Sequence, residues 1–95
     1  MNDKRSARDC RGNPVCVGDS VRVITIDPAF LAKLPKDEVD DVRSMIGEIF
    51  KVEEIDDQGS AWVWKWWERG NGRSESNGVA LGSVEMELVA SHDAN

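Results

Sequence analysis

The amino-acid sequence predicts a mainly β domain: five short strands forming a small, partly open antiparallel barrel, with a helical insertion at about residues 28–46 between the first and second strands. Three observations lead to this fold class. Short β-branched and aromatic runs alternate with turn residues along most of the chain. One stretch instead has a helical period and a capping residue at its start. The 95 residues support one core and hide their sheet edges only if the sheet curves on itself.

The first strand is predicted at residues 20–26, where a β-branched run follows a Gly-Asp turn signal. Successive side chains of a strand point to opposite faces, so Val21, Val23 and Thr25 are expected to share one face. This face is the first candidate for the core.

A helical insertion is predicted directly after this strand. Asp27 is a typical N-cap residue and Pro28 suits a first helical turn, so a short helix is expected at 29–34, ended by Pro35. A second helix is expected at about 36–45, because acidic residues occupy its first turn and a glycine follows its last. Its apolar residues form one stripe that we expect to pack against the sheet: Val39, Val42 and Ile46.

The second half of the chain has the period of strands, and Gly59 lies in a turn suited to a hairpin. Residues 69–78 contain three glycines and almost no apolar side chain, so a mobile loop is predicted there. The further strands are predicted at 50–55, 61–68, 79–81 and 86–89.

The composition suggests three parts: a flexible basic tail at 1–13, a single domain at 14–91, and a flexible C-terminus at 92–95. The tail has four basic and two acidic residues, whereas the rest of the chain has 8 basic and 16 acidic ones. We expect a solvated tail; the alternative is an arm for nucleic acid or an acidic partner. The net charge of −6 disfavours a binder of phosphate backbones.

The sequence predicts a cytoplasmic protein without membrane association. No apolar run reaches the roughly 18 to 20 residues of a spanning helix, and the N-terminus has no signal-peptide hydrophobic stretch. Cys10, Cys16 and the one histidine, His92, are too few and too scattered for a zinc site. Two free thiols are expected in the cytoplasm, and an oxidising compartment would allow a disulfide.

Several motifs, taken in order, resemble the SH3-like barrel group. They are Val-Gly-Asp-x-Val-Arg-Val at 17–23, Gly47 and Ile49 at the start of the second strand, the Gly59 hairpin, and Glu-Met-Glu-Leu-Val at 85–89. The resemblance covers about residues 15–89 and implies an SH3-like five-stranded barrel. That group includes small bacterial proteins of unassigned function, several of them carried on mobile elements such as integron cassettes.

The plan is also similar to that of the type II plasmid-encoded dihydrofolate reductases, which share the Gly-Asp-x-Val-Arg start. That family forms a tetramer and binds its ligands in a central pore through a Val-Gln-Ile-Tyr segment and a lysine. Here the matching segment contains Glu85 and Glu87, and Val23 stands at the corresponding lysine position. Two carboxylates per subunit would repel the phosphates of NADPH and the glutamate of folate, so reductase activity is not expected.

The residue types give little support to catalysis. Nucleophilic catalysis needs a nucleophile, a base and a group that orients the base, yet the one histidine lies in a predicted tail and the chain has no tyrosine. The glycine-rich stretch lacks the Gly-Lys-Ser/Thr ending of a P-loop. We therefore predict no enzyme activity, no cofactor and no metal. Adjacent carboxylates are expected in turns or on solvated faces: Asp37-Glu38, Asp40-Asp41, Glu53-Glu54 and Asp56-Asp57.

Four tryptophans within residues 62–67 are the most unusual feature of the sequence. A strand places Trp62, Trp64 and Trp66 on one face and Trp67 beside Lys65 on the other. An uncovered row of indoles would be a costly apolar patch, so something is expected to cover it. Three alternatives stay open: the row faces the core or the helical insertion, it forms a self-association interface, or it recognises a peptide, a nucleotide base or a cationic group.

These observations predict a non-catalytic binding module that engages a protein partner, or itself as a homodimer, through the tryptophan strand. The alternative is a small-molecule-binding protein or enzyme whose site is shared between subunits of an oligomer. Nucleic-acid binding by stacking tryptophans is disfavoured by the acidic charge. The predicted binding surface consists of Trp62, Trp64, Trp66 and Trp67, with Arg69 and Arg73 of the glycine-rich loop as anion-facing groups.

Overall fold

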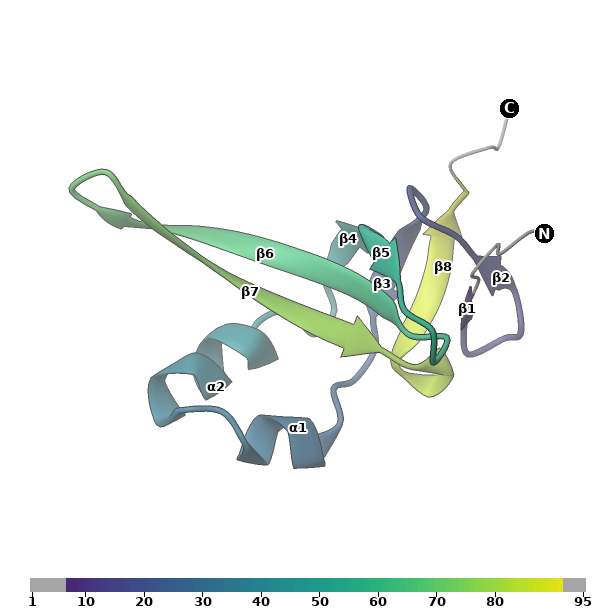
Figure 1. Cartoon of the computed structure of the whole chain (residues 1–95), viewed down its shortest axis with the longest axis horizontal. Coiled ribbons are helices and arrows are strands. Elements are labelled where there is room, and N and C mark those ends of the chain that lie inside the picture. Colours follow the sequence, from purple (N-terminus) through teal and green to yellow (C-terminus); the bar gives the residue numbers. More distant parts are fainter. Residues whose placement is uncertain (1–6, 92–95) are drawn as a thin grey trace.

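The computed structural model describes residues 7–91, except for the side chain of Arg69. This part of the chain is mainly β, as predicted, and has eight strands and two α-helices, arranged as in Figure 1. The elements are β1 (Ala7–Arg8), β2 (Pro14–Val15), β3 (Ser20–Val23), α1 (Pro28–Ala32), α2 (Lys36–Arg43), β4 (Ile49–Lys51), β5 (Glu54–Ile55), β6 (Ala61–Gly70), β7 (Arg73–Leu81), the 3-10 turn η1 (Ser83–Glu85) and β8 (Met86–Ala90).

The described strands form three antiparallel sheets, with strand orders β1-β2, β4-β3-β8 and β5-β6-β7. The strand predicted at 50–55 is split between two of them, because the chain crosses at Val52 and Glu53. The N–H of Val52 donates to the carbonyl of Asp19 beside β3, whereas the N–H of Glu53 donates to the carbonyl of Trp62 in β6. No closed barrel is present among the sheets of residues 7–91, so the SH3-like arrangement remains a prediction.

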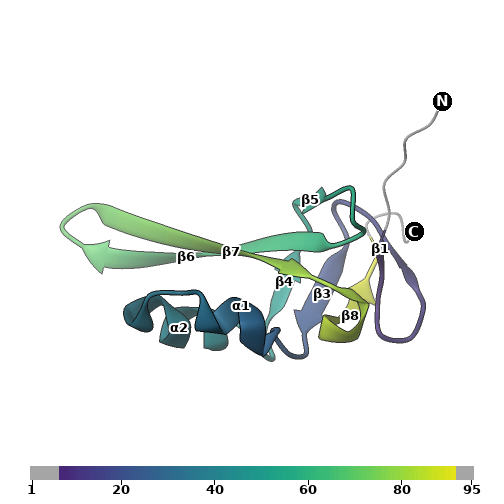
Figure 2. The same ribbon diagram turned by 60° about the horizontal axis from the view of Figure 1, so that its bottom comes forward.

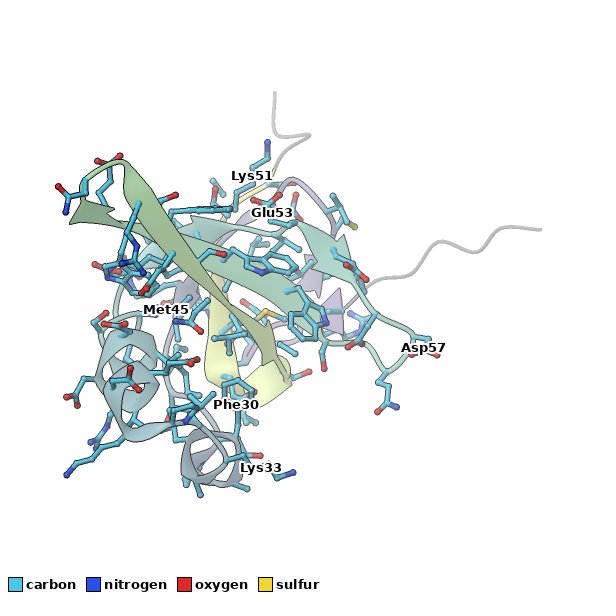
Figure 3. All side chains as sticks on the ribbon, turned by 60° about the vertical axis from the view of Figure 1, so that its left-hand side comes forward. Phe30, Lys33, Met45, Lys51, Glu53 and Asp57 are labelled. Carbon is cyan, nitrogen blue, oxygen red and sulfur yellow. The ribbon has the colours of Figure 1, made fainter. Side chains whose placement is uncertain are left out.

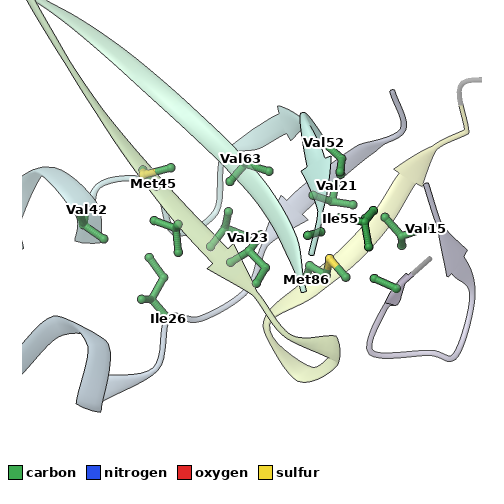
Figure 4. Close-up of a cluster of buried hydrophobic side chains, with 14 residues drawn as sticks. Val15, Val21, Val23, Ile26, Val42, Met45, Val52, Ile55, Val63 and Met86 are labelled. Carbon is green, nitrogen blue, oxygen red and sulfur yellow. The ribbon is translucent and has the colours of Figure 1, made fainter. Parts of the chain in front are cut away.

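One core lies between the two three-stranded sheets and the helical insertion (Figure 4). Val21 and Val23 are fully buried, as predicted for one face of the first strand. Thr25 is exposed, because β3 ends at Val23 and the alternation ends with it. The buried apolar residues are Ala7, Val15, Val21, Val23, Ile26, Val42, Met45, Val52, Ile55, Ala61, Val63, Val79, Leu81 and Met86.

The helical insertion at 28–46 is confirmed. The carboxylate of Asp27 accepts the N–H of Ala29 at 2.9 Å and caps α1, which runs from Pro28 to Ala32 and not over the predicted residues 29–34. No helix in the described part of the chain is long and apolar enough to cross a membrane.

The apolar stripe of the second helix is only partly as predicted. Val42 is buried and Val39 is half-buried, but Ile46 is 41% exposed. Because α2 ends at Arg43, the helical spacing no longer applies to Ile46. Met45, in the turn after the helix, is fully buried in its place.

The N-terminal segment from residue 7 onward is folded onto the domain. Asp9 is only 2% exposed, and its carboxylate accepts backbone N–H groups from Arg11 at 2.9 Å, Asn13 at 2.8 Å and Leu88 at 2.8 Å. Burial by itself raises the pKa of Asp9, but the hydrogen bonds outweigh it and the pKa is lowered from its ordinary value of 3.8. This carboxylate therefore joins the segment to β8.

The described part of the predicted basic tail thus belongs to the folded domain, since β1 pairs with β2 and both cover the end of the core. Residues 1–6 of that tail and the predicted flexible C-terminus at 92–95 lie outside the described residues.

Residues 69–78 are not a loop, and the prediction of one was wrong. Strands β6 and β7 pair from Ala61↔Leu81 to Gly70↔Arg73 and form a long hairpin that projects from the rest of the molecule (Figure 1). Asn71 and Gly72 make its two-residue turn with φ angles of 54° and 72°, which is typical of a type I′ turn. The Asn-Gly pair favours a hairpin despite the low apolar content of residues 69–78, because pairing with β6 requires only backbone groups.

We call residues 64–78 the arm and the remainder of β6 and β7 the base of the hairpin. The base covers the core, whereas the arm extends past it, and Trp67 is the residue of the arm that still packs against the core. Figure 2 shows the two helices lying alongside the arm, below it in that view.

Candidate functional site

The tryptophan row of β6 lies on the outer face of the β5-β6-β7 sheet. Ala61 and Val63, which alternate with the row, are fully buried, whereas Trp66 is 67% exposed. Trp62 and Trp64 are half-buried. The alternative in which the row faces the core or the helical insertion is therefore wrong, because the core, which includes Val42 of the insertion, lies on the side of Ala61 and Val63. We call Trp62, Trp64 and Trp66 the outer tryptophan row.

Each indole of the row stands opposite a small residue of β7. The cross-strand partners are Ala80 for Trp62, Gly78 for Trp64 and Ser76 for Trp66. The indole of Trp64 lies directly against Gly78, since a Cβ at that glycine would come within 2.6 Å of the ring atom Cε2. Small partners leave room for large rings to lie across the sheet, so the row forms a broad aromatic surface.

Two contacts fix the indoles at the Trp62 end of the outer tryptophan row. The rings of Trp62 and Trp64 stack with centroids 5.6 Å apart and an angle of 25° between their planes. The indole N–H of Trp62 donates to Oδ2 of Asp56 at 3.1 Å, while Oδ1 of Asp56 accepts the backbone N–H groups of Gln58 and Ser60. Asp56, predicted to be only a solvated turn residue, therefore fixes the first indole of the row.

Carboxylates stand at both ends of the outer tryptophan row. Glu54 of β5 is the cross-strand partner of Trp62, and Glu68 lies two residues beyond Trp66, so both share the outer face. Both are exposed. Among the described side chains, neither forms an ion pair. Figure 3 shows Glu53 and Asp57, together with Lys51, on the side of the molecule away from the helical insertion.

Trp67 is separated from the row by the sheet itself. It is half-buried and packs against the core from the inner face of β6. On that face Nζ of Lys65 lies 5.3 Å from the ring centroid of Trp67 and 2.6 Å from Oε1 of Glu48. The predicted surface of four tryptophans is therefore divided, with three indoles outside and one inside.

The two arginines of the predicted surface lie at the tip of the arm. Arg73 is exposed at the first position of β7, and Arg69 occupies a bulge of β6, between Glu68 and Gly70. Neither stands on a loop that could close as a lid, since both belong to paired strands.

A second feature, which the sequence did not predict, is an open groove of about 580 Å³ between α2 and β7. The long hairpin brings Glu75 of β7 near the acidic first turns of α2, which are far away in the sequence. The groove is lined by Asp37, Glu38, Asp41, Glu75, Ser76 and Asn77.

Metal-ligating and nucleophilic groups are scattered in this structure. Within residues 7–91 no three His, Cys, Asp or Glu side chains are placed to hold a metal ion. Cys10 and Cys16 are exposed free thiols. His92 lies outside the described residues.

Comparison of the chain with protein-family models, with curated proteins and with solved structures gives no match. The residues of the outer tryptophan row and of the acidic groove are thus the basis for a functional assignment.

Proposed function

We propose that this protein is a non-catalytic binding module that engages a protein partner, or a second copy of itself, through the outer tryptophan row. The observation that carries the proposal is Trp66, a tryptophan 67% exposed on the outer face of a regular strand. We further propose that the module is a cytoplasmic variant of the SH3-like barrel and comes from a bacterial mobile gene cassette.

The energetics of tryptophan support this use of the row. An indole buries on the order of 150 to 250 Å² when it is covered, so an exposed one is available to stabilise a complex. Tryptophan is enriched among the residues that dominate binding energy at interfaces. The row is also preformed, because Asp56 and the Trp62–Trp64 stack fix two of its rings, and little side-chain entropy remains to be lost on binding.

A small-molecule site is the second candidate, and the groove between α2 and β7 favours it. Its volume of about 580 Å³ is that of many ligand pockets. Its lining is carboxylates and other polar groups, which suits a cationic ligand better than an apolar one. In an oligomer a second subunit would complete this open groove.

Selection of peptides from a random display library tests the leading proposal. The wild-type chain and the Trp66→Ala variant would be compared, with Val84→Ala as the matched control because Val84 is 75% exposed in η1, outside the row. We expect the wild type and Val84→Ala to select the same peptides and Trp66→Ala to lose them.

Sedimentation velocity across protein concentrations tests the self-association branch with the same three proteins. Loss of a dimer in Trp66→Ala alone would place the contact on the row. If Trp66→Ala matches the wild type in both peptide selection and sedimentation, the row is not the binding surface.

A further inference from the structure

The spacing of the outer tryptophan row matches that of an extended polypeptide. Alternate residues of a strand are about 7 Å apart, so Trp62, Trp64 and Trp66 form three evenly spaced aromatic positions. A partner segment in an extended conformation presents its own alternate side chains at the same interval. The row and such a segment can therefore meet residue by residue.

The charge around the row indicates what those partner side chains are. Glu54 and Glu68 mark its two ends and lie on its face, and no described lysine or arginine occupies this face of β5, β6 or β7. The faces of indole rings carry negative electrostatic potential and attract ammonium and guanidinium groups. The indole rings and the carboxylates of this face thus both attract positively charged groups.

A contact within the protein shows the same combination of groups. On the inner face of β6, the ammonium group of Lys65 lies over the Trp67 ring at 5.3 Å from its centroid and against Glu48 at 2.6 Å. Trp66 and Glu68 offer an indole and a carboxylate on the outer face of the same strand, with no described cation between them.

A second copy of the chain fits this face poorly. Two-fold stacking of the rows would bring Glu54 and Glu68 of one copy against the same carboxylates of the other, and each chain has a net charge of −6. Like charges brought together across an interface are unfavourable, so the face favours a partner of opposite charge.

On the basis of the proposed function, we propose that the outer tryptophan row binds an extended partner segment with lysine or arginine at alternate positions. One cation lies over Trp66 beside Glu68, and another lies near Trp62 beside Glu54. The acidic chain attracts the basic segment, and the aromatic surface holds it.

Fluorescence anisotropy with short labelled peptides tests this proposal. The probes are an alternating Lys-Thr peptide and the corresponding Gln-Thr and Glu-Thr peptides, at low salt and at about 0.15 M salt. We expect only the Lys-Thr peptide to bind. Trp66→Ala should weaken its binding roughly 5- to 30-fold, whereas Trp66→Phe should retain part of the affinity.

A pair of double variants separates this face from general attraction to an acidic protein. Glu54→Gln/Glu68→Gln and Asp37→Asn/Glu38→Gln remove the same charge, but the second pair lies in the groove beside α2. We expect roughly 3- to 10-fold weaker binding and a smaller salt dependence for the first pair, and less than about 2-fold weakening for the second. Thermal unfolding of each variant establishes that it is folded.

The outcomes distinguish this proposal from the broader one. Equal loss in both double variants, or no effect of Trp66→Ala, would overturn binding at the row. If the Lys-Thr peptide does not bind while Trp66→Ala still abolishes selection of neutral peptides or dimerisation, the cationic partner is wrong and the binding module stands. If Trp66→Ala changes none of these measurements, both proposals fail.

Discussion

The base and the arm of the β6–β7 hairpin belong to the same two strands but are stabilised in different ways. At the base, the pairs Ala61↔Leu81 and Val63↔Val79 are almost completely buried over the core. In the arm, the inner face continues with Lys65 and Trp67, and the outer face ends in exposed residues. Burial of apolar area stabilises the base, whereas a turn, cross-strand pairs and contacts such as the Lys65–Glu48 ion pair define the arm.

This difference shows how the fold separates the residues that support the core from those of the proposed binding surface. Substitution of a residue buried under the base destabilises the fold, because the loss of its side chain leaves a cavity. Residues on the outer face of the arm contribute little to the core and remain available for recognition. Mutations in the two regions should therefore separate stability from binding.

The largest effect is expected at the base. Leu81→Ala removes a fully buried side chain and should lower the free energy of unfolding by about 2–5 kcal/mol, because a cavity is left between the sheets. Urea unfolding measures the change. The exposed Val84→Ala control should stay within about 0.5 kcal/mol of the wild type. Equal effects of the two variants would mean that the base does not depend on burial.

Asp9→Asn tests the N-terminal segment beside the base, and its effect should depend on pH. The pKa of Asp9 is lower in the folded protein, so its stabilising contribution is complete above the ordinary pKa and is lost as the pH falls through the lowered one. At neutral pH we expect a loss of about 1–3 kcal/mol, because three backbone donors lose their ionised acceptor.

Urea unfolding at neutral and at acidic pH provides the measurement for this variant. The difference between Asp9→Asn and the wild type should shrink as the pH falls below the folded pKa, because Asp9 is then protonated in the wild type as well. Asp57→Asn, at an exposed turn residue, is the control. A difference that is constant with pH would contradict the role of the carboxylate.

Gly78→Ala tests the junction between base and arm. The new Cβ would overlap the indole of Trp64, so the ring must leave its stack on Trp62, at a cost of about 1–3 kcal/mol. Thermal unfolding and the tryptophan emission spectrum should both change. Gly82→Ala is the matched control, since Gly82 has a negative φ and its nearest atom would be at 3.4 Å. Unchanged emission in Gly78→Ala would contradict the packing of the row.

The smallest effect is expected at the tip of the arm. Gly72 has a φ of 72° in the two-residue turn, and a Cβ there meets open space, so Gly72→Ala suffers only from backbone strain of about 1 kcal/mol. Urea unfolding measures this, again against Gly82→Ala. A loss as large as that of Leu81→Ala would show that the arm and the base are equally important to stability.

The positions of most elements could be predicted, because they depend on local chemistry. The Asp-Pro pair is sufficient to predict where α1 starts, and the alternation of Val21 and Val23 is sufficient to predict β3. The prediction of a loop at 69–78 was wrong. Low apolar content suggests a loop, but the Asn-Gly turn allows the strands to pair continuously. Strands β1 and β2 have two residues each and depend on the buried Asp9, so no local sequence pattern predicts them.

The candidate site could be predicted only as a set of residues. Alternation correctly grouped Trp62, Trp64 and Trp66, but it could not identify their small partners on β7, which depend on the register of the hairpin. The groove between α2 and β7 joins residues about 40 positions apart, and only the long hairpin brings them together.

The sequence by itself determined that three indoles share one face of a strand, that two small apolar residues share the other, and that a helical insertion follows the first strand. Only the tertiary structure decided which face of that strand points outward. Apart from Lys65, both faces of residues 61–67 are apolar, so hydrophobicity alone does not distinguish them. Ala61 and Val63 enter the core cluster that also contains the fully buried Val21 and Met86, and the indoles are left outside, across the small residues of β7.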